Sequence, residues 1–585
     1  MKIMPKHSLN LRVYLFLGVV ILVSSLILYR LFILSVIRHS TYLRTAQAQS
    51  ENVSNILARG NIYLSDGNSD PIIAATNKKF PLVYIIPADI KREESSSITE
   101  KISSILNIDP ESIKEKINSG SKSLRVIKRR ISEGDVLAIK DINIKGVGVK
   151  YETDRYYPMG SLASDVVGFL GYDSEGKKAG QYGSEAYYDN ELFGKEPTFT
   201  NLFSAINPSK VVKLIRKIKG ENIDKDETEQ EFDRPANVVL SIDKNVQTFA
   251  ENELRLIMEK WGAEKGTVIV EDPETGRILA MADLPSFDPN NYSEYESKLY
   301  LNGSIQEIYE PGSSFKPVTM SAGIDLGKIT PGTTYEDKGF VNISGYTIHN
   351  FSNKVFGVQS MTQVLEKSIN TGTMFVENLV GDDDFMNYVI NMGFGQKTGI
   401  DLSGEISGDI NNLYSGRKVN FLTASFGQGI AVTPLQLINA YAVIANGGKL
   451  MRPHVVDKIL KEGGVEEITK PEIISIPISE KTAVKLQSML VGVVDNGFDK
   501  ARIKGYDIAG KTGTAQIPGE GGGYLEGQFI HNFVGFAPAY NAKFVILIKI
   551  DKPKGITFAS DSLSPSFKNI AAFLLNYYNV PPTRK

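Results

Sequence analysis

The sequence predicts a membrane-anchored α+β protein, with one N-terminal transmembrane helix, an elongated mixed domain and a larger domain in which helices flank a sheet. Three observations predict this class. A long apolar run stands near the N-terminus, a polar segment of mixed strand and helix patterns follows, and the rest alternates helices with early strands before a late run of strands. Such patterning is typical of helices packed on a sheet. At 585 residues the chain is long enough for two or more domains.

Bulk composition excludes several kinds of function. The net charge of −2 provides no basic excess to neutralise phosphates, so nucleic acid is not expected as a partner. The absence of cysteine excludes disulfides and thiolate chemistry. Only five histidines are present, without an H-E-x-x-H motif, so a metal site is not expected. No cofactor is predicted.

The apolar run at residues 13–37 predicts a transmembrane anchor. About 20 apolar residues span a bilayer, and Arg30, the one charged residue in the run, lies near its far end, where its side chain can reach the interface. Residues 1–12 carry three basic residues, so they are predicted to be cytoplasmic and the rest of the chain extracytoplasmic, in the cytoplasmic membrane. A cleaved signal peptide is the alternative, because "AQA" at 46–48 imitates a cleavage site. That site lies too far beyond the run, which favours an uncleaved anchor.

Residues 38–233 are predicted to form the first extracytoplasmic domain. Strand-like apolar runs stand between turn signals, and two short amphipathic helices are predicted on either side of Asp109-Pro110. Residues 213–233 swing from basic to acidic and contain few large apolar groups. This composition indicates an exposed connection, and it predicts a domain boundary near Asp233.

Residues 234–585 are predicted to form one larger domain. "NVVLSID" and "GTVIVEDPETGRILAMADLP" have strand patterns, and "KNVQTFAENELRLIMEKWG" between them has helical spacing. Near the end, "YDIAGKTGTAQI", "HNFVGFAPAY" and "KFVILIKI" predict three strands, and "PSFKNIAAFLLNYYNV" predicts a closing helix. A sheet with helices on its faces follows from this order.

The stretch "EPGSSFKP", residues 310–317, places a lysine three residues after the first of two adjacent serines. Residues three apart share a helix face, so Ser313 and Lys316 are predicted to lie together, at a helix start that "PG" introduces, while Ser314 points elsewhere. A serine needs an adjacent base to act as a nucleophile, and a lysine can serve if burial lowers its pKa. The alternative is a capped surface helix, because this spacing is common by chance, so partner motifs must decide.

Two further motifs follow in order. Ser368 and Asn370 stand two residues apart between helical patterns, where a hydroxyl and an amide can face one pocket. K-T-G occurs twice, at Lys397 and at Lys511. Glycines around the first copy indicate a loop, whereas the second lies in an alternating strand pattern, so Lys511 is the predicted copy. A strand beside a cleft can offer a lysine, hydroxyls and N–H groups to an anionic substrate, and Gly513 would let the substrate backbone approach closely.

Each motif is weak alone, but S-x-x-K, S-x-N and K-T-G in this order resemble the signature of the penicillin-binding proteins and serine β-lactamases. "ARGNIYLSDGN", "YYPMGSLASDVVGFLGYD" and "FGQGIAVTPLQLINAYAVIANGGKLMRPHVV" extend the resemblance to nearly the whole chain. The chain resembles a class B penicillin-binding protein, a membrane-anchored peptidoglycan D,D-transpeptidase, and the division-type members more than the elongation-type ones. The resemblance implies a pedestal (dimerisation-type) domain at 38–233. It also implies a transpeptidase domain at 234–585, with a five-stranded antiparallel sheet flanked by helices as in serine β-lactamases.

The resemblance also implies roles for the motif residues. Ser313 would attack the D-Ala-D-Ala carbonyl, Lys316 would take its proton, and Ser368 would relay a proton to the leaving amine. Backbone N–H groups of Ser313 and Thr514 would form the oxyanion hole. The implied catalytic set is Ser313, Lys316, Ser368 and Lys511, and the implied substrate-binding set is Asn370, Thr512, Gly513 and Thr514.

The implied partners are peptidoglycan stem peptides, β-lactams that acylate the serine, the membrane, a SEDS-family glycan polymerase and other division proteins. A D,D-carboxypeptidase or β-lactamase of the same fold is one alternative, against which the large pedestal and the anchor argue. A catalytically silent scaffold is another, against which the complete motif set argues. Residues Pro518–His531, with their run of glycines, predict a mobile loop beside the K-T-G strand, either a gate to the cleft or a plain connection.

Overall fold

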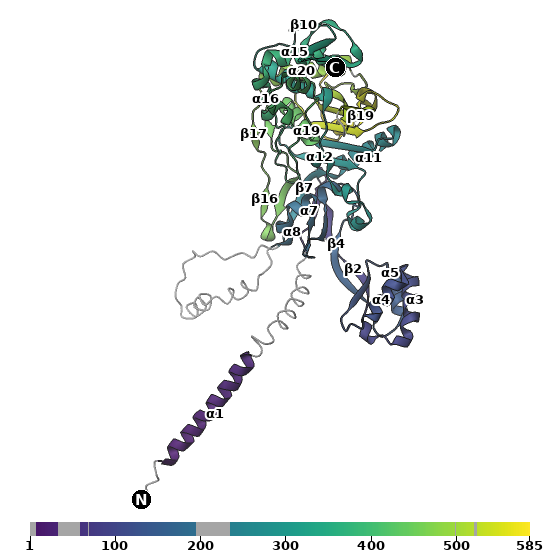
Figure 1. The fold of residues 1–585 in the computed structure, drawn as a ribbon, viewed down its shortest axis with the longest axis vertical. Coiled ribbons are helices and arrows are strands. Elements are labelled where there is room, and N and C mark those ends of the chain that lie inside the picture. The colour runs from purple at the N-terminus through teal and green to yellow at the C-terminus, as the bar shows by residue number, and fades with distance from the viewer. Residues whose placement is uncertain are drawn as a thin grey trace. The chain divides into compact units, whose positions relative to one another are not determined.

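A computed structural model describes residues 7–32, 59–67, 69–194, 235–497, 499–519 and 523–584. The chain divides into two compact units, Met1–Ala58 with Glu196–Lys225, and Arg59–Lys195 with Asp226–Lys585. In the first unit the described residues form one helix, α1 (His7–Phe32), as Figure 1 shows. Across the described ranges, no helix is both long enough and apolar enough to cross a membrane. Residues 1–6 and 33–37 of the predicted tail and anchor, and the boundary predicted near Asp233, lie outside these ranges.

The second unit contains two large sheets, and the first of them has seven strands. In spatial order they are β16 (Glu466–Ile468), β15 (Val456–Leu460), β7 (Asn237–Asp243), β1 (Ile62–Ser65), β2 (Ile72–Ile85) and β3 (Arg125–Arg129), with β4 (Val147–Tyr156) also paired to β2. β1 and β7 run parallel, and the other pairs are antiparallel. Because β1 and β2 precede the predicted boundary while β7, β15 and β16 follow it, one sheet joins the two predicted domains.

Three helices pack against the part of this sheet that β2, β3 and β4 form. They are α3 (Ser95–Leu106), α4 (Pro110–Asn118) and α5 (Glu133–Ile142), and their apolar faces form one buried cluster with β2. The predicted break between two helices is confirmed. Asp109 accepts a hydrogen bond from the Glu111 N–H, and Pro110 occupies the first helical position, where its missing N–H costs nothing.

The rest of the pedestal segment packs next to the seven-stranded sheet. It comprises α6 (Ser164–Val167), β5 (Phe169–Tyr172), β6 (Lys178–Gln181), α7 (Gly183–Tyr187) and α8 (Asp189–Phe193). Glu185, on α7, is fully buried and accepts hydrogen bonds from Arg59 Nε at 2.7 Å and Arg155 Nε at 2.6 Å. The two guanidinium groups lower the pKa of the Glu185 carboxyl, so it is ionised in the folded protein. This buried charge network ties the start of the described pedestal to its core.

Replacing Glu185 by alanine is expected to lower the free energy of unfolding by about 3–5 kcal/mol, because two buried guanidinium groups would lose their counter-charge. Urea unfolding of the purified protein measures this. Replacing exposed Glu175, which pairs only with neighbouring Lys177 at the surface among its described contacts, is the control and should change stability by less than about 1 kcal/mol. Equal effects of the two changes would contradict the assigned role of Glu185.

The second large sheet has five antiparallel strands, as the resemblance implied. Their order is β18 (Ala509–Pro518), β19 (Tyr524–Ala537), β20 (Phe544–Asp551), β8 (Lys265–Glu271) and β9 (Ile278–Leu284). One face packs on α11 (Lys244–Trp261) and α22 (Ser564–Tyr577). The other face packs on α19 (Pro434–Ala445), which is buried along its whole length. The predicted sheet with helices on both faces is therefore confirmed.

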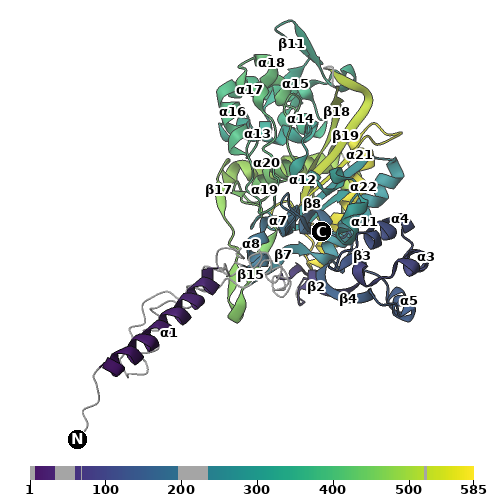
Figure 2. The same cartoon turned by 60° about the horizontal axis from the view of Figure 1, so that its bottom comes forward.

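A group of helices lies beside β18 and β19, as Figure 2 shows. It comprises α13 (Lys316–Asp325), α14 (Met361–Glu366), α15 (Asn370–Val380), α16 (Asp382–Asn391), α17 (Asn411–Tyr414), α18 (Lys418–Ala424) and α20 (Glu480–Gly492). Two short antiparallel strand pairs lie beside this group. β10 (Thr334–Asp337) pairs with β13 (Gly357–Ser360), and β11 (Phe340–Ile343) pairs with β12 (Tyr346–His349). A further short pair joins β14 (Leu450–Met451) to β17 (Ile473–Ser475). We call α13–α18 with the β10–β13 and β11–β12 pairs the helical half of the larger domain.

The loop predicted at Pro518–His531 is mostly strand. β19 begins at Tyr524, which pairs with Pro518 of β18; after a register shift, Phe529, Ile530 and His531 pair with Gln516, Ala515 and Thr514. Only the short connection before Tyr524 remains, and residues 520–522 of it lie outside the described ranges. The prediction was wrong for most of the segment because a glycine run suggests a loop, whereas a long hairpin needs only backbone pairing to extend beyond the core.

Candidate active site

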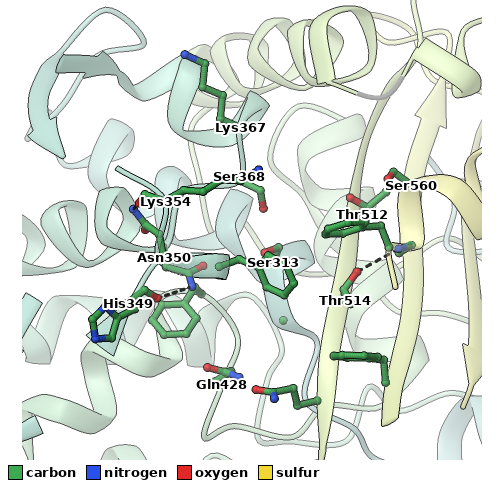
Figure 3. Close-up of a pocket in the computed structure, with 18 of the residues that line it drawn as sticks. Ser313, His349, Asn350, Lys354, Lys367, Ser368, Gln428, Thr512, Thr514 and Ser560 are labelled. Carbon is green, nitrogen blue, oxygen red and sulfur yellow. Dashed lines mark hydrogen bonds between the residues drawn. The ribbon is translucent and has the colours of Figure 1, made fainter. Parts of the chain in front are cut away.

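A cavity of ≈ 500 Å³ lies between β18 and the helical half. Residues from all three predicted motifs line it, including Ser313, Ser368, Asn370, Thr512 and Thr514 (Figure 3). The three motifs, which are up to two hundred residues apart in sequence, therefore meet at one cleft between the two halves of the domain.

Ser313 stands in a 3₁₀ turn, η6 (Gly312–Phe315), directly before α13. In a 3₁₀ turn residues three apart lie above one another, so Ser313 and Lys316 share a side, as the sequence predicted. Ser314 is fully buried and donates its hydroxyl hydrogen bond to Pro311 O at 2.8 Å. Of the two serines, only Ser313 lines the cavity.

Lys316, the first residue of α13, is fully buried. Its Nζ lies 2.6 Å from Ser368 O, 2.8 Å from Asn370 Oδ1 and 3.3 Å from Ser368 Oγ. Burial, together with the nearby Lys511 charge, lowers its pKa well below the usual range for lysine. A neutral amine has two N–H groups, which the two closest oxygens accept, and one lone pair that remains for a proton. The lowered pKa favours the neutral form of this lysine, which is the form that a general base requires.

Ser368 links the two lysines of the site. It occupies the break between α14 and α15, as predicted, and its backbone is in the left-handed region with φ 55°. Its Oγ lies 3.3 Å from Lys316 Nζ and 3.1 Å from Lys511 Nζ. Burial lowers the pKa of Lys511 to about 7. A hydroxyl between two amines of lowered pKa can pass a proton from one to the other.

β18 presents alternate residues to the cavity. Thr512 and Thr514 line it, and Thr514 Oγ1 accepts a hydrogen bond from the Ala559 N–H at 3.1 Å, drawn dashed in Figure 3. That bond leaves the Thr514 hydroxyl hydrogen free to donate to a ligand. At Gly513 an added Cβ would lie 2.5 Å from Pro311 O and 2.5 Å from the Asn532 amide. Close packing of β18 on the η6 turn therefore requires this glycine, and its predicted contact with substrate stays a prediction.

The first K-T-G copy, which starts at Lys397, does not line this cavity. Thr398 and Gly399 donate their backbone N–H groups to the carboxylate of Glu405, and Gly399 has φ 79°. These bonds form a closed loop around one carboxylate, as the surrounding glycines predicted. Among the described residues, only the copy that starts at Lys511 contributes to the cleft.

Several residues of the site were not predicted. Glu310, just before the nucleophile turn, accepts hydrogen bonds from the Gly429 N–H at 2.8 Å and from Tyr524 Oη at 3.0 Å. Tyr524 thus ties the end of the β18–β19 hairpin to the turn that carries Ser313. The segment from His349 to Phe356 also lines the cavity. No local pattern marks these residues, because tertiary pairing alone brings them to the cleft.

His531 is a further buried residue, on β19 opposite Thr514 of β18. Its Nε2 lies 3.1 Å from Thr557 O, which can only accept, so Nε2 carries the hydrogen. Its Nδ1, 2.8 Å from Ser562 Oγ, then accepts from that hydroxyl. Both bonds hold the segment 557–562, whose Ala559 N–H contacts Thr514. Burial lowers the pKa of His531 to about 4.

A test of this arrangement is the pH dependence of stability. Because the folded pKa of His531 lies below the unfolded value, its contribution is complete above about pH 6.5 and is lost as pH falls toward 4. Between neutrality and about pH 5 the wild-type protein is expected to lose roughly 2 kcal/mol more than the variant His531→Gln, whose amide can make both bonds without titrating. Urea unfolding at the two pH values measures this, and parallel losses would contradict a buried neutral histidine.

Comparisons with known proteins agree with this site. Residues 266–572 match the family described as the penicillin-binding protein transpeptidase domain, and residues 56–224 match the penicillin-binding protein dimerisation domain. Stage V sporulation protein D of Bacillus subtilis is 32% identical over 87% of this chain and 77% of its own length. Peptidoglycan D,D-transpeptidase FtsI of Escherichia coli is 27% identical over 98% of this chain and 93% of its own.

Solved structures are similar as well. Penicillin-binding protein 3 of Mycobacterium tuberculosis in complex with aztreonam is 29% identical, with a TM-score of 0.63 over 74% of this chain and 92% of its own. The matched transpeptidase region contains the described Ser313, Ser368 and Lys511 motifs in one cleft. The chain therefore belongs to the penicillin-binding proteins, and its combination of a dimerisation domain with a transpeptidase domain makes it a member of class B, the serine D,D-transpeptidases.

Proposed function

We propose that this protein cross-links peptidoglycan through an acyl-enzyme on Ser313, formed from the D-Ala-D-Ala end of a stem peptide. One observation carries the proposal: Ser313 faces a cavity, and three residues later, at the start of α13, a buried lysine of lowered pKa contacts Ser368 and Asn370, which line the same cavity. A serine with a neutral lysine as its base is a complete nucleophile for acyl transfer.

Acylation follows from these contacts. Lys316 takes the proton of Ser313 as the serine Oγ bonds to the carbonyl carbon of the penultimate D-alanine. Backbone N–H groups of Ser313 and Thr514 stabilise the oxyanion, and such a donor is typically worth about 3 kcal/mol in the barrier. The carbon–nitrogen bond then breaks, and Ser368 passes a proton to the leaving amine of the terminal D-alanine. The contact of Ser368 Oγ with both lysines supports this relay.

Substrate binding uses the two walls of the cleft. Lys511, Thr512 and Thr514 bind the terminal carboxylate of the stem peptide, or that of a β-lactam. Asn370 holds the side-chain amide of the donor. Gly513 keeps β18 close to the nucleophile turn. An amine from a second stem peptide then attacks the ester carbonyl, restores the Ser313 hydroxyl and completes the cross-link.

The cellular setting is part of the proposal. Residues 13–37 anchor the protein in the cytoplasmic membrane, with residues 1–12 inside and the catalytic domain outside. This part of the proposal rests on the apolar run in the sequence, since no described helix is both long enough and apolar enough to cross a membrane. A septal role is supported by the named division-type relative, FtsI. A SEDS-family polymerase and other division proteins are the proposed partners. Retention in membranes after carbonate extraction tests the anchor, and release of the full chain would overturn it.

A coupled assay tests the activity itself. The full chain in detergent is given a donor peptide ending in D-Ala-D-Ala and an acceptor peptide with a free side-chain amine. We expect release of D-alanine together with a cross-linked product. Release with only hydrolysed donor would make the protein a carboxypeptidase, and neither product with an intact, penicillin-reactive site would contradict the proposed substrate.

A further inference from the structure

The wall of the cavity opposite β18 carries two lysines, Lys354 and Lys367, together with His349 and one carboxylate, Glu366. Lys367 Nζ donates to Gln359 Oε1 at 2.7 Å, and Glu366 Oε1 accepts from Asn496 Nδ2 at 2.7 Å, whereas Lys354 lies across the cleft from Thr512 and Thr514 (Figure 3). Lys354 is exposed, and among the residues that the structure describes no carboxylate forms an ion pair with its Nζ. The mechanism assigned above does not use Lys354.

The turn that carries Lys354 is fixed by a buried carboxylate. Asp337, 2% exposed, accepts hydrogen bonds from Asn350 Nδ2 at 3.0 Å, the Phe356 N–H at 2.7 Å and Thr371 Oγ1 at 2.6 Å. Asn350 Nδ2 also donates to Lys354 O at 3.1 Å. Because Thr371 lies in the first turn of α15, these bonds tie the turn at 350–356 to the helix that carries the S-x-N motif.

The backbone of this turn is in an uncommon conformation. Ser352 and Asn353 have φ values of 56° and 55°, a region that residues with a side chain seldom adopt. Asn353 N–H donates to Asn350 O at 3.0 Å, which closes the turn. Lys354 therefore projects from a turn whose backbone is specified by several bonds, so the base of its side chain has a defined position beside the cleft.

The order of the reaction assigns this wall to one substrate. The terminal D-alanine leaves from the side of Lys511, Thr512 and Thr514, and the acceptor amine must enter where it left, because it attacks the same carbonyl. The acyl part of the donor peptide then lies on the other side of Ser313. Lys354, across the cavity from the two threonines, faces that part of the donor.

We infer that Lys354 is a specificity-determining residue that binds a second carboxylate of the donor stem peptide, carried by a side chain upstream of D-Ala-D-Ala. The inference rests on the proposed function. A cation without a described protein counter-charge attracts a carboxylate at little desolvation cost, and a fixed turn loses little entropy when it binds. Donors with a side-chain carboxylate are therefore preferred over the matched amides.

The experiment compares two donor peptides that differ only in a carboxylate or a primary amide on the residue before D-Ala-D-Ala. For the full chain, kcat/KM for D-alanine release is expected to be about fivefold higher with the carboxylate. Lys354→Ala removes the preference by lowering kcat/KM for the acid alone, and Lys354→Glu inverts it. The control Lys338→Ala changes an exposed lysine of the same half that does not line the cavity, and it should keep the preference.

Two results would overturn the inference: an acid-to-amide ratio in Lys354→Ala equal to that of the wild type, or a loss of the same size on both donors. Acylation by a penicillin that lacks a side-chain carboxylate distinguishes a failure of this inference from a failure of the proposed function. If that acylation and D-alanine release persist without any preference, only the inference fails. If neither occurs in the wild type, the proposed function fails, and the inference with it.

Discussion

Replacing Ser313 by alanine is expected to lower D-alanine release by at least about 10⁴-fold, because the acyl-enzyme can no longer form. The fold should persist, since one half-buried hydroxyl at a helix start contributes about 1 kcal/mol at most. Release of D-alanine by the purified variant measures the loss, and its thermal unfolding checks the fold.

A matched control stands next to it in the chain. Ser314 has the same side chain, but its hydroxyl is buried on Pro311 O. Ser314→Ala should keep activity within about tenfold, with a stability loss of about 1 kcal/mol from the missing hydrogen bond. Activity that survives in Ser313→Ala but not in Ser314→Ala would reverse the assignment of the nucleophile.

Replacing Lys316 is expected to slow acylation by about 10²–10⁴-fold, the usual contribution of a general base. The informative change is Lys316→Arg, because a guanidinium keeps the charge and does not release its proton. Stopped-flow acylation by a fluorescent penicillin measures the rate. Burial beside Lys511 lowers the pKa of Lys316, so the wild-type rate should remain high at neutral pH.

An arginine variant that acylates within about tenfold of the wild type would contradict the role of Lys316 as a base. Lys418→Arg is the control, because that lysine pairs with Glu377 and Asp382 in the helical half and does not line the cleft. It should acylate at nearly the wild-type rate. A similar loss in both variants would point to a general effect on folding.

The sequence predicted the catalytic sheet because its strands have local patterns. Strands such as β20, "FVILIKID", are apolar on both faces, which marks a strand covered by helices on each side. The pairing of β1 with β7 was not predictable in this way, because about 170 residues separate them and no local signal encodes the partner. That pairing makes one sheet run through both predicted domains.

The site was predicted as far as its motifs extend. Ser313 and Lys316 are three residues apart, so local geometry sets them on one side, and the order of the other motifs indicated their partners. The lysine contacts were not predictable in detail: Lys316 Nζ bonds to the backbone of Ser368, an interaction that carries no residue signature. The contributions of Asp337 and Tyr524 were not predictable for the same reason, since each contacts the site only through tertiary packing.

The most direct test of the central claim is to locate the covalent adduct. The wild-type protein is exposed to a penicillin and digested, and fragment-ion mass spectrometry then identifies the modified residue. The account predicts one adduct of the drug mass on the peptide that contains Ser313, with the mass on Ser313 and not on Ser314. An adduct on Ser368 or elsewhere, or none under conditions where the protein is folded, would contradict the claim that this cleft forms its acyl-enzyme on Ser313.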